Sequence, residues 1–118
     1  MKSYQDLVRE SKTRVREVSA SETARLLKEH PRTVLVDCRE PNESALGRIP
    51  GAVVIPRGML EQHIEGAAAR DQKVILYCAA GNRSALAADA LQQMGYTDVA
   101  SMAGGIRAWV DAGGEIAE

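Results

Sequence analysis

The chain has 118 residues, a formal charge of −1 and 26% charged residues of both signs. This length suits one domain whose core needs no metal or disulfide to hold it. Without a basic surplus, neither nucleic acid nor anionic lipid is an expected partner. Residues 1–6 lack the apolar segment of a signal peptide, and no apolar run approaches the ~20 residues of a bilayer span. We therefore expect a cytoplasmic protein that makes no membrane contact.

The first elements are a helix, a strand and a second helix. Residues 1–14 are polar, and a Ser-x-x-Asp capping pattern predicts a short helix with little apolar support. Residues 15–18 alternate as a half-exposed edge strand does. A second capping box opens a helix over residues 19–30, where a His-Pro pair ends it. The predicted organisation is a helical extension over 1–14 followed by one domain over 15–118.

Continuous apolar runs at 34–36, 52–55 and 74–77 predict three further strands. Runs of this kind are typical of parallel strands that helices cover on both faces. A fifth strand is expected at 98–101. Together these patterns predict a five-stranded, mainly parallel sheet.

Helices are expected between the strands. Residues 57–69 have modest helical spacing, whereas the segment from 82 to Met94 has strong spacing and a glycine at its end. A last helix follows Gly104-Gly105 and carries Ile106 and Trp109 on one face, which we interpret as core residues. The predicted fold class is therefore an α/β three-layer sandwich.

Cys78 is the principal candidate for chemistry. It follows the strand at 74–77 and begins a six-residue loop that ends at Arg83 and opens a helix. Backbone N–H groups of such a loop, the positive helix end and the arginine all favour a thiolate with a lowered pKa. The alternative is an inert cysteine that only ends a core strand. The small residues at 79–81 leave the sulfur accessible and favour the functional interpretation.

Asp37, Cys38 and Arg39 follow the strand at 34–36 in the same way. Sites in parallel sheets lie beyond the carboxyl ends of the strands, so we expect these residues and the Cys78 loop to share one pocket.

Other reactions of a nucleophilic cysteine would need partner residues that this sequence does not place near Cys78. A cysteine protease needs a histidine base, but His30 lies beside a helix-ending proline, His63 lies in a helix, and both are expected at the surface. No group of ligand residues has zinc spacing. We expect no metal and no cofactor, so the site must work through a thiolate and dipoles.

Three motifs in order resemble the rhodanese-like sulfurtransferases. Residues 78–85 resemble the family's active-site loop, Cys-x-x-Gly-x-Arg-Ser. Residues 36–52 resemble its N-terminal signature, including Glu43, and residues 102–109 resemble its C-terminal signature. The chain departs from the second signature at Arg48, where the family usually has histidine, and at Ser44, where an aromatic residue is usual. These departures bear on the packing of that loop and not on the nucleophile.

The resemblance implies a two-step sulfur transfer. The Cys78 thiolate takes the outer sulfur of a donor such as thiosulfate, and the resulting persulfide passes it to cyanide or to a thiol, which could be carried by a protein. The expected catalytic residue is Cys78. Expected substrate-binding residues are those of the loop: Ala79, Ala80, Gly81, Asn82, Arg83 and Ser84.

Several site residues have two interpretations. Asp37 and Arg39 could brace the loop or could be solvated strand ends. Arg83 could bind the donor anion or pair with an acidic neighbour, and the first is favoured. For Ser84, capping the helix is favoured over contact with the persulfide. Cys38 could resolve Cys78 or be a small core residue, because strand register is not readable from sequence.

Two other functions compete with sulfur transfer. The enzymatic alternative is a phosphatase or arsenate reductase, because the cell-cycle dual-specificity phosphatases resemble this fold. Those enzymes use a Cys-x5-Arg loop, whereas here Arg83 is the fifth residue after Cys78. The resemblance also covers non-catalytic or regulatory binding modules, which tend to lose the cysteine. Retention of Cys78 favours an enzyme. We expect a monomer.

Overall fold

The computed structural model describes all 118 residues and has a five-stranded sheet in which all strand pairs are parallel. The strand order is β1-β5-β4-β2-β3. This confirms the predicted fold class. The strands are β1 (Arg16–Val18), β2 (Val34–Asp37), β3 (Val53–Val54), β4 (Val74–Tyr77) and β5 (Val99–Met102).

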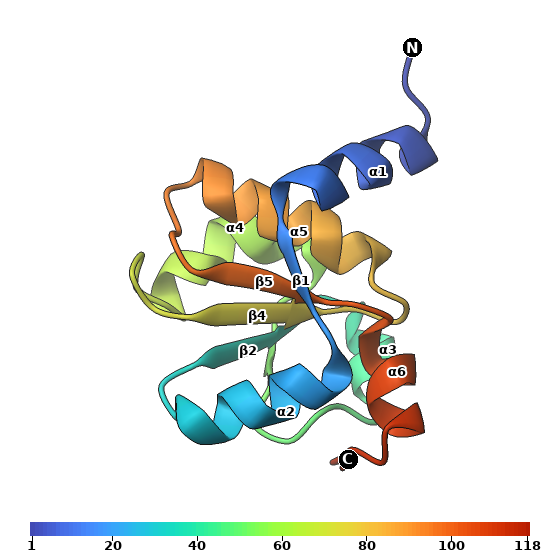
Figure 1. Ribbon diagram of the computed structural model, residues 1–118, viewed down its shortest axis with the longest axis vertical. Coiled ribbons are helices and arrows are strands. Elements are labelled where there is room, and N and C mark those ends of the chain that lie inside the picture. The colour runs from blue at the N-terminus through green and yellow to red at the C-terminus, as the bar shows by residue number, and fades with distance from the viewer.

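Helices cover both faces of the sheet (Figure 1). One face carries α4 (Leu60–His63) and α5 (Asn82–Gln93), with α1 (Tyr4–Arg14) packed outside α5. The opposite face carries α2 (Ala20–Glu29) and α6 (Gly105–Asp111). The molecule therefore has the three layers expected from the alternation of strands and helices.

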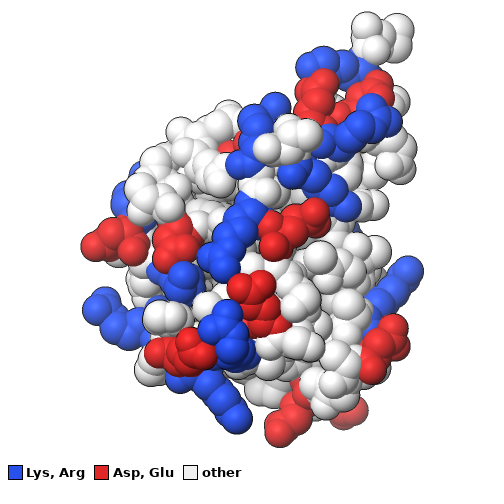
Figure 2. Space-filling view, viewed as in Figure 1, with Lys and Arg blue, Asp and Glu red and all other residues white.

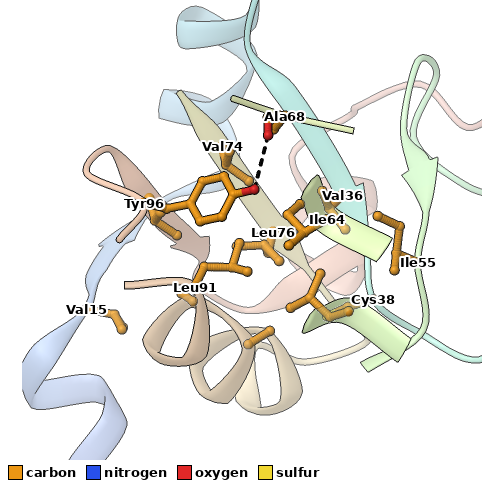
Figure 3. Close-up of a cluster of buried hydrophobic side chains, with 14 of the residues drawn as sticks. Val15, Val36, Cys38, Ile55, Ile64, Ala68, Val74, Leu76, Leu91 and Tyr96 are labelled. Carbon is orange, nitrogen blue, oxygen red and sulfur yellow. Dashed lines mark hydrogen bonds between the residues drawn. The ribbon is translucent and has the colours of Figure 1, made fainter. Parts of the chain in front are cut away.

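Each face of the sheet has its own apolar core. The larger core lies under α4 and α5 and includes Val36, Leu76 and Leu91 (Figure 3). The second core lies under α2 and α6 and includes Ile75 and Trp109. Because side chains alternate along a strand, β2 and β4 supply both cores, and all four residues of β4 are buried.

Two predicted elements differ from the structure. Residues 57–69 do not form one helix but three short pieces: a 3-10 turn at Arg57–Met59, then α4, and a 3-10 turn at Ile64–Gly66. None of the three has a side-chain cap, so no capping hydrogen bond stabilises the ends of these short pieces. The strand expected at 52–55 shortens to the edge strand β3, whose Val53 is exposed and not buried on both faces.

The N-terminal helix is held by polar contacts that its weak apolar pattern did not indicate. Its capping box at Ser3 is present as predicted, and Val8 is buried. On α5, the Asp89 carboxylate accepts hydrogen bonds from Ser11 and Arg14. The extension over 1–14 therefore lies against its own domain, and its boundary at residue 15 stays a prediction.

Charges of both signs are intermixed on the face that Figure 2 shows, in keeping with the near-zero net charge. No helix in this structure combines the length and the apolarity that crossing a bilayer would take.

Candidate active site

Cys78 lies directly after β4 and is 1% exposed, so the expectation that the small residues at 79–81 leave its sulfur accessible was wrong. The Gly81 N–H donates to its sulfur at 3.1 Å and the Ser84 N–H at 3.4 Å. Gly81 has a φ of +99°, which lets the loop turn back toward the sulfur. A Cβ added at this position would lie only 3.0 Å from the Gly104 nitrogen. The predicted nest of N–H groups is thus formed around the sulfur.

The loop favours the anionic form of the sulfur. Burial alone would raise the pKa of the Cys78 thiol. Hydrogen bonds from the Ser84 hydroxyl and from the N–H groups of Ser84, Ala80 and Gly81 outweigh burial, and the pKa falls below its usual 9.0. The positive end of α5 adds to this effect. A larger fraction of Cys78 is therefore thiolate at neutral pH.

Ser84 does not cap the helix, so the favoured interpretation of this residue was wrong. Gly81 holds the cap position, and Ser84 is the third residue inside α5. Its Oγ lies 3.5 Å from the Cys78 sulfur and 2.8 Å from the Ser101 Oγ. The helix begins before Ser84 because Gly81, with its positive φ, holds the cap position. Ser84 therefore lies inside the first turn, where its side chain faces the Cys78 sulfur.

Arg83 pairs with an acidic neighbour, the less favoured of its two interpretations. Its guanidinium donates to both carboxylate oxygens of Glu43, at 2.9 and 3.1 Å. These hydrogen bonds hold the pKa of Glu43 at about 2 despite partial burial. Glu43 belonged to the sequence signature, but no local pattern indicated that it meets Arg83. A role of Arg83 in donor binding stays a prediction.

Asp37 and Arg39 form a buried brace rather than solvated strand ends. The fully buried Asp37 carboxylate accepts from Arg39 at 2.7 Å, from Ser44 at 3.0 Å and from the Tyr77 hydroxyl at 2.9 Å. Burial alone would raise the pKa of Asp37, but the hydrogen bonds from Arg39 and Tyr77 lower it overall. Ser44, which stands where the family usually has an aromatic residue, supplies one of these hydrogen bonds through its short hydroxyl side chain.

This brace does not reach the Cys78 sulfur. Asp37 pairs with Tyr77 across the sheet, so their side chains share one face and those of Cys38 and Cys78 share the other. Arg39 also donates to the Gly47 carbonyl, and the Tyr77 hydroxyl accepts from the Ile49 N–H. The brace therefore acts through the segment that follows β2, and the expectation that Asp37 and Arg39 share one pocket with the Cys78 loop was wrong, because a strand sends alternate side chains to opposite faces.

The start of α6 orients the Cys78 loop through hydrogen bonds to the loop's carbonyl groups. The Ile106 N–H donates to the Cys78 carbonyl at 2.9 Å, and the Arg107 N–H donates to the Ala79 carbonyl at 3.4 Å. With these carbonyls bound to α6, the N–H groups further along the loop are free to face the sulfur. Sequence patterns identified α6 only as a helix with a core-facing Trp109, which packs 7% exposed as expected.

The remaining loop residues form a small rim. Ala80 is exposed, and Ala79 and Asn82 are half-buried. His30 and His63 are exposed at the surface, as expected. The structure therefore brings together Cys78, Ala80, Gly81 and Ser84 at the sulfur, with Arg83 and Glu43 beside them.

Comparisons with known proteins agree with these motifs. The rhodanese-like domain family matches residues 19–112. A sulfurtransferase of Allochromatium vinosum is 34% identical over 99 residues, which cover 84% of this chain and 92% of that protein. Thiosulfate sulfurtransferase GlpE of Pseudoalteromonas translucida is 35% identical over 101 residues, or 86% of this chain and 94% of that protein.

A solved structure from Rhodopseudomonas palustris, of a protein of unknown function described as a possible tyrosine phosphatase, is also similar. It has a TM-score of 0.89 and 36% identity, and the match covers 99% of this chain and 96% of that one.

Proposed function

The chain belongs to the rhodanese-like sulfurtransferase family, and from this we propose that it moves a sulfane sulfur from thiosulfate, or another donor, to a thiol or cyanide through a persulfide on Cys78. One observation carries the proposal: the Cys78 sulfur accepts hydrogen bonds from the Gly81 and Ser84 N–H groups, and such contacts lower the pKa of its thiol despite burial. Thiosulfate is named as donor because GlpE, a relative of similar length, is a thiosulfate sulfurtransferase.

In the first step the Cys78 thiolate attacks the outer sulfur of thiosulfate. A bond forms between the two sulfurs, the S–S bond of thiosulfate breaks, and sulfite leaves with the electron pair. No external base takes part because the nucleophile is already ionised. This agrees with a loop whose donors to the sulfur are N–H groups and one hydroxyl, with no histidine among them.

In the second step an acceptor thiolate or cyanide attacks the outer sulfur of the persulfide, and Cys78 leaves as a thiolate. The terminal sulfur of a persulfide is also anionic, so the N–H groups that stabilise the thiolate can stabilise this sulfur. Preorganised donors of this kind typically contribute about 3 kcal/mol each to a transition state. The leaving group is thus the species that the loop already favours.

Phosphate ester hydrolysis is the alternative that the description of the R. palustris protein raises. Two features argue against it. Arg83 is the fifth residue after Cys78, one short of the phosphatase loop, and its guanidinium is bound to Glu43. The guanidinium that would bind a phosphate dianion is thus already paired with a carboxylate. A non-catalytic module is disfavoured because it would not need a Cys78 thiol with a lowered pKa.

The test compares wild-type protein with Cys78→Ala. We expect thiosulfate to add one sulfur atom to Cys78, seen by intact mass spectrometry, and thiocyanate to form when cyanide follows. Cys78→Ala should lose both, with circular dichroism showing that it is folded. Full thiocyanate formation by the alanine variant would refute the proposal.

Parallel assays separate the alternatives. Turnover with a mercaptopyruvate-like acid or a low-molecular-weight persulfide, but not with thiosulfate, would keep the chemistry and change the donor. Hydrolysis of an aryl phosphate that depends on Cys78, with no sulfur loading, would favour the phosphatase alternative.

A further inference from the structure

The chain has two cysteines, and the structure places them side by side. β2 and β4 are neighbours with Asp37 paired to Tyr77, so the next residues, Cys38 and Cys78, lie opposite each other. The Cys38 N–H donates to the Tyr77 carbonyl at 2.9 Å, which continues the strand pairing up to this point. Both side chains belong to the core under α4 and α5, where Figure 3 labels Cys38. The strand register and the shared face of the sheet therefore both place the two thiols close together.

The separation suits a disulfide. Neighbouring strands run about 4.8 Å apart, and disulfides join Cα atoms about 4.4 to 6.8 Å apart. The Cys38 Sγ also lies 3.2 Å from the Tyr77 carbonyl oxygen, to which its thiol donates. The Cys38 sulfur is thus directed toward β4, at the residue immediately before Cys78. Both cysteines are free in this structure.

We propose that Cys38 is a resolving thiol that discharges the Cys78 persulfide as hydrosulfide when no external acceptor is present. The inference rests on the proposed function, because it needs that persulfide. The Cys38 thiolate attacks the inner sulfur, on Cys78. A Cys38–Cys78 bond forms, the bond between Cys78 and the outer sulfur breaks, and hydrosulfide leaves with the electron pair. The two thiols are oxidised by two electrons, and the sulfane sulfur is reduced to sulfide.

The electrostatics of Cys38 make this step slow and dependent on pH. Burial raises the pKa of Cys38 strongly, and the nearby Cys78 and Asp37 charges raise it further, while Arg83 and Arg57 partly oppose them. The attacking thiolate is therefore scarce at neutral pH and increases as the pH rises. Sulfur transfer to a good acceptor would precede resolution, and the disulfide would accumulate only when donor is present without acceptor.

The disulfide would hold the enzyme inactive until a dithiol reduces it. An external dithiol would attack the Cys78 sulfur, Cys38 would leave and take up a proton, and a second attack by the dithiol would release Cys78. Both cysteines are buried in this structure, so the loop after β4 has to open to admit the dithiol to Cys78, whereas Cys38 need not be reached.

The experiment compares wild-type protein with Cys38→Ser, which keeps a hydroxyl donor for the Tyr77 carbonyl and removes the nucleophile. Both proteins are loaded with thiosulfate, freed of donor without oxygen, and followed by intact mass spectrometry and a sulfide probe. In the wild type we expect the persulfide to give way to a species two hydrogen atoms lighter than reduced protein, with one equivalent of sulfide and a Cys38–Cys78 crosslink. In Cys38→Ser, sulfide release should be slower by about tenfold or more.

The outcomes are distinguishable. A wild-type persulfide that lasts as long as the one on Cys38→Ser overturns the inference and leaves the proposed function standing. Faster wild-type sulfide release at pH 9 than at pH 7, absent in the variant, supports it, because only a nearby thiol that ionises produces this difference.

Failure of both proteins to load from thiosulfate, from a mercaptopyruvate-like acid and from a low-molecular-weight persulfide refutes the proposed function and, with it, the persulfide step. A separate arm with diamide, a two-electron thiol oxidant, then tests the pair without any persulfide. A rapid crosslink in that arm supports the placement of Cys38, and its absence overturns it.

Discussion

At the scale of single residues, Ser84 is the one side chain that hydrogen-bonds the Cys78 sulfur; the other donors are backbone N–H groups. The Ser84 hydroxyl also forms a hydrogen bond with the Ser101 hydroxyl at 2.8 Å, which holds the Ser84 side chain in position. A backbone N–H is removed only by proline, which would also change the loop conformation, whereas alanine removes this hydroxyl alone. Ser84 is therefore the residue with which the electrostatic contribution of the loop can be measured.

We expect Ser84→Ala to raise the pKa of Cys78 by about one unit, because a hydrogen bond to a charged group is worth about 1.5 kcal/mol or more. The pH profile of sulfur loading should move to higher pH by the same amount. Loading at neutral pH should slow several-fold, while the rate at high pH, where both proteins are ionised, should be similar.

Thiolate absorbance against pH and loading rates across pH 5 to about 10 measure both effects, because the titration of an ordinary cysteine falls in this range. Ser21→Ala, at an exposed position on α2, is the matched control. An unchanged pH profile for Ser84→Ala would show that the backbone N–H groups alone set the pKa of Cys78.

At the scale of elements, the site depends on a contact between α6 and the loop after β4. Gly105 begins α6 with φ of +61°, and a Cβ there would overlap the backbone of Cys78 and Ala79. The same contact carries the hydrogen bond from the Ile106 N–H to the Cys78 carbonyl. A helix that is distant in sequence thus sets the direction of the loop's peptide groups.

We expect Gly105→Ala to push the loop out of position, because neither the positive φ nor the space accommodates a methyl group. Sulfur loading on Cys78 should fall by about tenfold or more, on the scale of a lost set of oriented donors. The pKa of Cys78 should rise toward its usual value, and the protein should remain folded by circular dichroism.

Gly58→Ala is the control for this change, since Gly58 has no positive φ and no atom near an added Cβ. Gly105→Ala with wild-type loading and an unshifted pKa would mean that the loop keeps its shape without α6.

At the scale of the whole molecule, Asp37 joins parts of the chain that are far apart in sequence. Its carboxylate binds Arg39, Ser44 and Tyr77, so it ties β2 to β4 and to the start of the loop leading to β3. All of these contacts are buried. Removing one partner of a buried pair leaves the other charge unpaired, which is costly.

We expect Asp37→Asn to lower the free energy of unfolding by about 3 kcal/mol, measured by urea denaturation at pH 7. The folded-state pKa of Asp37 is lowered from 3.8, so its contribution is present above that pH and is lost as the pH falls through the folded value. The difference between wild type and variant should therefore shrink below about pH 4.

Asp71→Asn, which removes an exposed carboxylate outside the ion pairs of this structure, should change the stability little at either pH. Equal stabilities of wild type and Asp37→Asn at pH 7 would show that the brace makes no net contribution.

The sequence by itself determined the secondary structure around the site and its chemical type. The apolar runs identified β2 and β4, the capping boxes located α1 and α2, and the loop from Cys78 to Arg83 indicated an activated thiol. These features are local, because helix caps, strand patterns and a loop of N–H groups depend on residues close together in the chain.

Only the tertiary structure decided which distant residues meet. It paired Arg83 with Glu43, turned Ser84 to the sulfur instead of the helix end, and placed Cys38 beside Cys78. Each outcome depends on strand register or on packing between layers, and a shift of one residue would send a side chain to the opposite face of the sheet. Composition and spacing carry no record of register, so the sequence left Cys38 as either a partner of Cys78 or a core residue, and only the pairing of β2 with β4 placed the two thiols side by side.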